Sequence, residues 1–208
     1  MKQILAFGDS NTWGLVPGSF PHKRYPWGVR WTSLVQEKNR NIRIAEEGLC
    51  GRTTVFEDEL RPGRKAVKSL DPLLESHYPI DGAILMLGTN DCKAFYNASP
   101  YVIGKGIERC LDIIEKYIPP EKIILVSPIH LGEDVWRPEK DPEFDKQSVA
   151  TSKELGHIYR DIAKRRGTAF FEASEHVSPS GIDDEHMDEE GHRIFAEEIY
   201  KEIEAIIA

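Results

Sequence analysis

The sequence has few cysteines and no long apolar run, and both shortages exclude whole classes of protein. Its three cysteines are odd in number and show no C-x-x-C spacing, so they predict neither a disulfide framework nor a zinc or thioredoxin-like site. No stretch approaches the roughly 18 apolar residues of a membrane span. The first apolar run ends by Gly8, which is too short for a signal peptide. We therefore expect a soluble protein of the cytoplasm with no membrane partner.

Positive charge is also in short supply. Lysine and arginine total 27 against 35 acidic residues, which gives a net charge of -8. Nucleic-acid binding draws on clustered basic side chains that release counterions from the phosphates. The one basic run, KRR at 164–166, is better explained as the last turn of a helix, where cations oppose the negative end of the dipole. We expect no nucleic-acid partner.

Neither repeats nor Gly/Ser-rich linkers interrupt the chain, so we expect one domain over residues 1–208. Apolar runs of strand length alternate with longer stretches of helical period, which is typical of a parallel sheet covered on both faces by helices. The predicted fold class is α/β, with three layers (α/β/α) and five parallel strands. The expected strands are residues 3–7, 42–46, 82–87, 122–127 and 168–171.

Helix boundaries are marked by capping residues. Ser99 and Pro100 form an N-cap and first-turn pair, and Gly167 is a C′ residue after the basic turn. A final helix runs through Phe195. The longest stretch without periodicity, from Pro128 to about Phe144, is too long for an ordinary connection and predicts a lid or pocket wall.

Gly8-Asp9-Ser10-Asn11 follows the first predicted strand directly. In an open parallel sheet, ligands bind beyond the carboxyl ends of the strands, so a serine there is a candidate nucleophile. These four residues also favour turns, which explains the tetrapeptide equally well when it is taken alone.

Two further strands end in small or amide residues. Gly51 follows the second strand and can present a backbone N–H, and Asn90 follows the third strand with an amide donor at the same edge. Ordinary turns would explain both segments in isolation.

The segment after the fifth strand contains Asp183 and His186 in a D-x-x-H spacing. A carboxylate at this spacing can meet the imidazole Nδ1–H and fix the tautomer, which leaves Nε2 free to take a proton from a serine. A solvated surface histidine is the alternative for this segment on its own.

The functional prediction rests on the combination of these segments. Separate segments after separate strands converge on one sheet edge and supply the parts that acyl transfer needs, without a cofactor. Ser10 is the predicted nucleophile, His186 the general base and Asp183 its orienting partner. The oxyanion would be held by the N–H groups of Ser10 and Gly51 and the side chain of Asn90.

GDSN, a glycine after the second strand, GTND and D-x-x-H resemble, in this order, the four blocks of the SGNH or GDSL-type esterase and lipase family. FGDSNTWG, EEGLCGRTT and MLGTNDCKA look like its small bacterial arylesterase and acyltransferase branch. The resemblance implies a flavodoxin-like strand order, 2-1-3-4-5, and Ser10, Gly51, Asn90 and His186 as the block residues, with Asp183 completing the triad.

The same resemblance implies a substrate site lined by residues such as Trp13 and assembly into homo-oligomers. One departure concerns Cys50 and Gly51, where that branch tends to carry serine and alanine. The glycine fits the broader family, whereas the cysteine leaves open the polarity of the acyl pocket and any preference for acyl transfer. We interpret Cys50 as a pocket-lining residue, not a nucleophile, because buried thiols are usually inert.

The predicted activity is hydrolysis, or acyl transfer, of small esters with short acyl or aryl groups. A carbohydrate acetyl esterase, a thioesterase or a lysophospholipase would use the same triad. A non-catalytic binding module on this fold is an alternative of another class. We expect no metal site, because His186 and His192 are six residues apart and fit neither H-E-x-x-H nor H-x-x-E-H.

Overall fold

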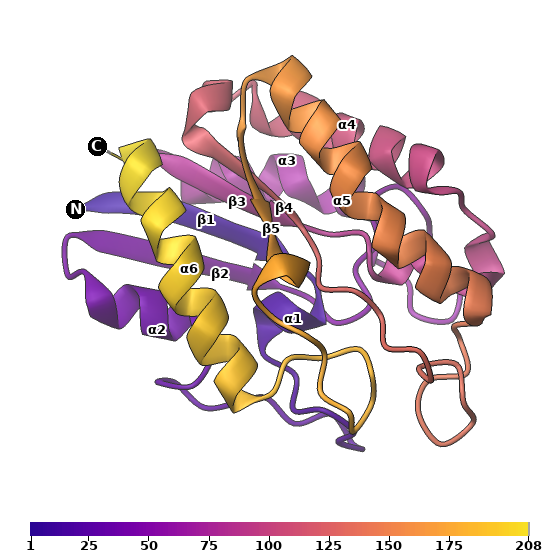
Figure 1. Cartoon of the computed structure of the whole chain (residues 1–208). Helices are drawn as coiled ribbons and strands as arrows, with labels where there is room; N and C mark the ends of the chain where they lie inside the picture. The colour runs from indigo at the N-terminus through magenta and orange to yellow at the C-terminus, as the bar shows by residue number, and fades with distance from the viewer. Residues whose placement is uncertain (208) are drawn as a thin grey trace.

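The structure is a computed structural model, and it describes residues 1–207 (Figure 1). Five parallel strands form one sheet in the order β2-β1-β3-β4-β5, which confirms the predicted order. The strands are β1 (Lys2–Gly8), β2 (Ile42–Gly48), β3 (Gly82–Met86), β4 (Ile123–Ser127) and β5 (Ala169–Glu172). The α-helices are α1 (Ser10–Trp13), α2 (Trp31–Lys38), α3 (Ala66–His77), α4 (Pro100–Ile114), α5 (Lys146–Arg166) and α6 (Glu189–Ile207).

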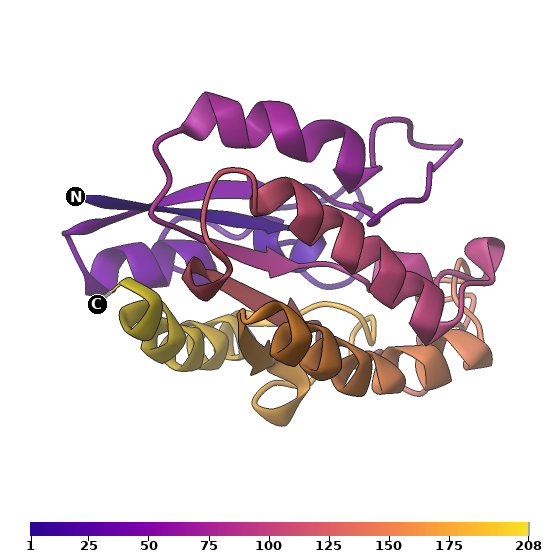
Figure 2. The same ribbon diagram turned by 90° about the horizontal axis from the view of Figure 1, so that it is seen from above.

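Helices cover both faces of the sheet, as the apolar strand runs predict. Leu5 and Phe7 of β1 face a core formed with α3, α4 and α5. Ile4 and Ala6 of the same strand face a second core formed with α2 and α6. Figure 2 shows α3 on one side of the sheet and α2 with α6 on the other. The three-layer α/β/α prediction is confirmed.

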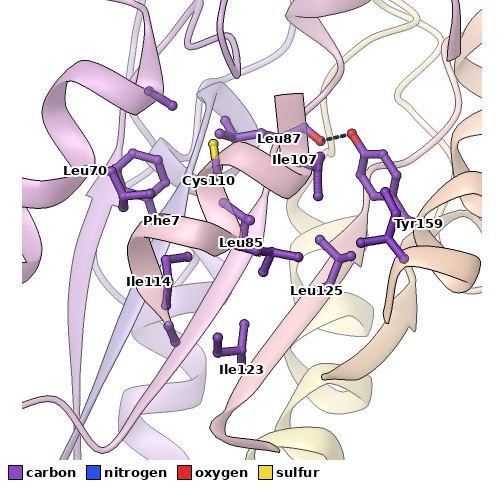
Figure 3. Packing of buried hydrophobic residues seen from close by; sticks show 14 of the residues in the cluster. Phe7, Leu70, Leu85, Leu87, Ile107, Cys110, Ile114, Ile123, Leu125 and Tyr159 are labelled. Atoms are coloured by element: carbon purple, nitrogen blue, oxygen red, sulfur yellow. Dashed lines mark hydrogen bonds between the residues drawn. The ribbon is translucent and has the colours of Figure 1, made fainter. Parts of the chain in front are cut away.

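The core under α4 and α5 contains a buried tyrosine whose hydroxyl group is fixed by a hydrogen bond. Figure 3 shows Tyr159 of α5 donating a hydrogen bond to the carbonyl oxygen of Leu87, at 2.9 Å. Tyr159 is fully buried, and a buried hydroxyl without a partner would cost free energy. This bond ties α5 to the segment that follows β3, beside the carboxyl end of the sheet.

The predicted helix signals hold in the structure. Ser99 caps α4, and Gly167 ends α5 with a left-handed φ of 79°. The basic last turn of α5 also has local acidic partners, because Arg166 lies 2.7 Å from Glu115 and 2.8 Å from Asp112. The two arginines of the KRR run therefore pair with acidic residues in and beside α4. Among the described residues, no helix has both the length and the apolar character to cross a membrane.

The carboxyl ends of the central strands are aligned, which places the segments that follow them side by side. Gly8, the last residue of β1, pairs with Gly48 of β2 and with Met86 of β3. Figure 1 shows α1 and the segment between β5 and α6 together at this end of the sheet. The sheet thus gathers the candidate residues at one edge.

Candidate active site

Ser10 is held in a tight strand-to-helix turn. It is the first residue of α1, and Asp9 caps this helix by accepting a hydrogen bond from the Asn11 backbone N–H at 3.0 Å. The turn lies directly on the end of β2, because a Cβ added to Gly48 would be 2.2 Å from the Trp13 backbone nitrogen. Only glycine fits at position 48, and the close contact fixes Ser10 over the sheet edge.

Asp183 and His186 lie in the segment between β5 and α6. The Asp183 Oδ2 atom is 2.9 Å from His186 Nδ1, and its Oδ1 atom accepts the backbone N–H groups of Glu185 and His186 at 3.1 and 3.0 Å. A backbone N–H from Gly18 adds a fourth bond, to Oδ2 at 2.9 Å. A carboxylate can only accept, so the neutral form of His186 carries its proton on Nδ1 and leaves Nε2 free.

The structure brings Ser10 and His186 together although they are 176 residues apart in sequence. His186 Nε2 lies 2.8 Å from Ser10 Oγ, and both side chains are buried. This distance is within hydrogen-bond and proton-transfer range for a hydroxyl and a general base. The predicted contact between the two ends of the chain is therefore present.

A residue missed by the sequence analysis joins these two segments. The Asn11 side chain donates to the Glu185 carbonyl oxygen at 3.3 Å and accepts from the Met187 backbone N–H at 2.9 Å. Asn11 is buried, so both bonds are shielded from water. It follows Ser10 in the GDSN motif, which is a signal that could have identified it. Asn11 positions the His186 segment against Ser10.

Gly51 and Asn90, the predicted oxyanion donors, border the same space as Ser10. Gly51 adopts a φ of 80°, a left-handed conformation that disfavours residues with a side chain. The Asn90 amide donates one hydrogen bond to the Arg52 carbonyl oxygen at 3.2 Å, which orients the group and leaves its second N–H unused. Arg52 is itself anchored by a 2.7 Å bond to the Gly8 carbonyl oxygen.

Ser10 opens onto a small polar cavity of about 140 Å³, here named the Ser10 cavity. Side chains with charge or hydrogen-bonding capacity dominate its lining. The lining residues are Ser10, Leu15, His22, Cys50, Gly51, Arg61, Asn90, Lys93, Asp141, Glu143, Glu185 and His186. Asp141 and Glu143 come from the long segment after β4, which confirms its prediction as a pocket wall.

Two residues predicted to contact substrate lie in different surroundings. Cys50 lines the Ser10 cavity, and burial raises the pKa of its thiol to about 11, so it is protonated at neutral pH. Trp13 is not among the described residues that line this cavity. The Arg24 guanidinium lies over the Trp13 ring, 5.4 Å from its centroid. The family resemblance predicted Trp13 as a residue of the substrate site, and this role stays a prediction.

The electrostatics of the site centre on His186. Burial opposes its charged form, but the carboxylates of Glu185 and Asp183 outweigh this cost and raise its pKa to about 9. Burial raises the pKa of Glu185 to about 7 and that of Asp9 to about 6. For Asp183, burial raises the pKa, but the charge and hydrogen bond of His186 and the backbone N–H groups of His186 and Glu185 outweigh burial and lower it. The site thus contains one carboxyl group whose pKa is lowered, that of Asp183, and two whose pKa values are close to neutral pH, those of Glu185 and Asp9.

His192 does not take part in the site. Its ring is fully buried, and its Nδ1 atom lies 3.3 Å from the Trp31 backbone nitrogen, which donates to it. Burial lowers the pKa of His192 to about 4, so it is neutral. Within residues 1–207, no three or more His, Cys, Asp or Glu side chains gather as metal ligands would.

Comparison with known sequences identifies one matching family. A sequence model of the GDSL-like lipase/acylhydrolase family matches residues 6–194, which is most of the chain. No curated protein matches the chain.

Several solved structures share the whole fold. An aryl esterase from M. smegmatis is 30% identical, with a TM-score of 0.89 over 99% of this chain and 100% of that one. A carbohydrate acetylesterase from Sinorhizobium meliloti is 32% identical, with a TM-score of 0.87 and the same coverage, 99% and 100%. A second carbohydrate acetylesterase family member from that organism is 28% identical, with a TM-score of 0.88 over 100% and 99%.

Proposed function

Because this chain belongs to the GDSL-like lipase/acylhydrolase family, we propose that it cleaves small carboxylic esters through an acyl-enzyme on Ser10. The observation that carries the proposal is the chain of contacts from Ser10 Oγ to His186 Nε2 (2.8 Å) and from His186 Nδ1 to Asp183 Oδ2 (2.9 Å). This is the arrangement of nucleophile, base and orienting carboxylate that acyl transfer requires.

The reaction begins when neutral His186 takes the Ser10 hydroxyl proton as Oγ attacks the ester carbonyl carbon. The imidazolium that forms is stabilised by Asp183, and it then protonates the departing alcohol oxygen as the carbon–oxygen bond of the ester breaks. In the second half, His186 takes a proton from water, which attacks the acyl carbon. The acid leaves, and His186 returns the proton to Ser10 Oγ.

The tetrahedral intermediate carries a negative oxygen that needs donors. The N–H groups of Ser10 and Gly51 and the second N–H of Asn90 are the proposed donors, supported by their common position on the Ser10 cavity. Removing one such donor typically costs roughly 3 kcal/mol of transition-state stabilisation.

The cavities favour a short acyl group and a larger leaving group. The Ser10 cavity, at about 140 Å³, is well below the roughly 300 Å³ at which pockets for drug-sized ligands begin. It adjoins a second cavity of about 410 Å³, named the outer cavity, with which it shares Lys93 and Glu143. Leu60, Phe95 and Tyr96 line the outer cavity. An acetyl group fits the inner space, and the apolar outer space suits an aryl alcohol.

A second candidate is an acetylated carbohydrate, and the lining of the Ser10 cavity favours it. Lys93, Asp141 and Glu143 border the space through which a leaving alcohol passes. Lys93 pairs with Glu143, and the Asp141 carboxylate accepts the Glu143 backbone N–H at 2.9 Å, so these groups have partners of their own. They retain donors and acceptors for the hydroxyls of a sugar, which an aryl ring lacks. The related carbohydrate acetylesterase from S. meliloti supports this alternative.

The test is the rate of p-nitrophenol release from p-nitrophenyl acetate by wild type, Ser10→Ala and His186→Ala. We expect each substitution to lower kcat by at least roughly a thousandfold. Ser76→Ala and His157→Ala are matched controls, because both residues are exposed and outside the cavity. Activity retained in Ser10→Ala would end the proposal. A parallel assay with acetylated sugars separates the two alcohol classes.

A further inference from the structure

We propose that Glu185 is a specificity-determining residue that makes water, and not an alcohol, the preferred acceptor of the acyl group. The inference rests on the proposed function, since it concerns the second half of that reaction. Glu185 lies directly before His186 in the chain and lines the Ser10 cavity. It has no part in the triad or the oxyanion hole described above.

The Glu185 carboxyl group is buried but free to accept a hydrogen bond. Only 6% of the residue is exposed, and its Oε1 atom lies 3.7 Å from His186 Nε2, the atom that also contacts Ser10. That separation is beyond hydrogen-bond range. No donor within the described part of the chain bonds to its side-chain oxygens, although its carbonyl oxygen is bound by Asn11. Because Glu185 lines the Ser10 cavity, its carboxyl group is available to a donor from a molecule that enters this cavity.

One oxygen atom can contact both Nε2 and Oε1. Their separation of 3.7 Å is much shorter than two hydrogen bonds of about 2.8 Å laid end to end. In the acyl-enzyme, Ser10 Oγ is esterified and no longer donates to His186. A molecule that takes its place on Nε2 is therefore also within reach of Glu185.

Water and alcohols differ at this position by one proton. A water molecule directs one O–H to Nε2, which takes that proton as the oxygen attacks the acyl carbon, and directs the other O–H to Glu185. The acyl–Oγ bond then breaks, His186 returns the proton to Oγ, and the acid product retains the second hydrogen. An alcohol has a single O–H, so its alkyl group faces the carboxyl and leaves that acceptor unpaired, which is costly when buried.

The Glu185 side chain can accept a hydrogen bond throughout the neutral pH range. His186 and Lys93 favour its carboxylate form, whereas burial, Asp141 and Asp183 oppose it, and the balance raises its pKa to about 7. The protonated acid still has a carbonyl oxygen that accepts. Discrimination between water and alcohol therefore does not require full ionisation.

The test is the partition of the acetyl-enzyme between water and methanol, the alcohol with the smallest apolar group. p-Nitrophenyl acetate is the donor, and acetate and methyl acetate are both quantified. We expect Glu185→Leu to raise the ratio of methyl acetate to acetate at least about tenfold, as for a lost hydrogen bond to a charged group. Glu185→Gln keeps an acceptor without the charge, so its ratio should rise only about threefold. Glu139→Gln, at an exposed glutamate, is the matched control.

The outcomes separate this proposal from the one on which it rests. If p-nitrophenol release does not depend on Ser10, the acyl-enzyme and the role of Glu185 fail together. If release depends on Ser10 but neither Glu185 variant changes the product ratio, only the role of Glu185 is overturned. Should Glu185→Leu fold poorly by circular dichroism, an unchanged ratio in Glu185→Gln is sufficient to reject it.

Discussion

Replacing Glu185 with glutamine should move the acidic limb of the pH profile of kcat/KM to lower pH. Only neutral His186 can act as the base, so this limb follows its ionisation in the free enzyme. The pKa of His186 is raised to about 9, with Glu185 the largest of the contributions that raise it. Glu185 has a pKa of about 7, so it is ionised where His186 titrates and exerts its full effect there.

The size of the shift follows from the distance between the two groups. Unit charges 3.7 Å apart interact by about 1 kcal/mol in water and about 4 kcal/mol at an effective dielectric constant of 20. One pKa unit corresponds to about 1.4 kcal/mol, so losing the charge lowers the pKa of His186 by roughly one to three units. The limb of the variant is then expected at roughly pH 6 to 8 instead of near pH 9.

The assay is kcat/KM for p-nitrophenyl acetate across the pH range, with the rate of Ser10→Ala subtracted as background. At pH 7 the variant is expected to exceed wild type, because more of its His186 is neutral. Glu139→Gln removes an exposed carboxylate and should leave the limb in place. A Glu185→Gln limb that coincides with that of wild type would refute the electrostatic reasoning.

Three further predictions concern positioning and specificity. Asn11→Ala removes two buried hydrogen bonds to the His186 segment. We expect urea unfolding to show that the free energy of unfolding falls by roughly 2 kcal/mol, and kcat to fall with little change in KM. An unchanged kcat would contradict the positioning role. Gly51→Ala strains a left-handed residue by roughly 1 kcal/mol and displaces the proposed oxyanion donor, so the unfolding temperature and kcat should both fall. A stable variant with full activity would argue against this role. Across p-nitrophenyl esters, kcat/KM should fall from acetate to octanoate because the Ser10 cavity is small; a steady rise would contradict the short-acyl proposal.

The sequence predicted the sheet well because its strands are buried on both faces. The runs at Ile4, Ile84 and Ile124 have no polar interruption, and only a central parallel strand accommodates such runs in a chain of this composition. Turn residues after each strand then predicted where the polar groups would gather. The contact between Ser10 and His186 was predictable from the fold, because both residues follow strands that end at the same sheet edge. No local sequence pattern connects the two residues.

Details of the cavity could not be predicted, because they depend on how loops fold over the sheet edge. Glu185 is one of several acidic residues in its segment, and nothing in the pattern distinguishes it from the half-buried Asp184 beside it. The backbone bonds to Asp183 and Asn11 are what fix its placement. The ring of Trp13 packs with Arg24, eleven residues further along the chain, and its role in the substrate site stays a prediction. Assembly into oligomers and location in the cytoplasm stay predictions.

The central claim is that the acyl group passes through Ser10 Oγ with His186 as the base. Its most direct test is mass spectrometry of the protein quenched during turnover of p-nitrophenyl acetate, with the acetylated peptide identified by fragmentation. The account predicts one acetyl group on Ser10, and none in Ser10→Ala. An acetyl group on Cys50 or on another side chain, with Ser10 unmodified under conditions of rapid turnover, would contradict it.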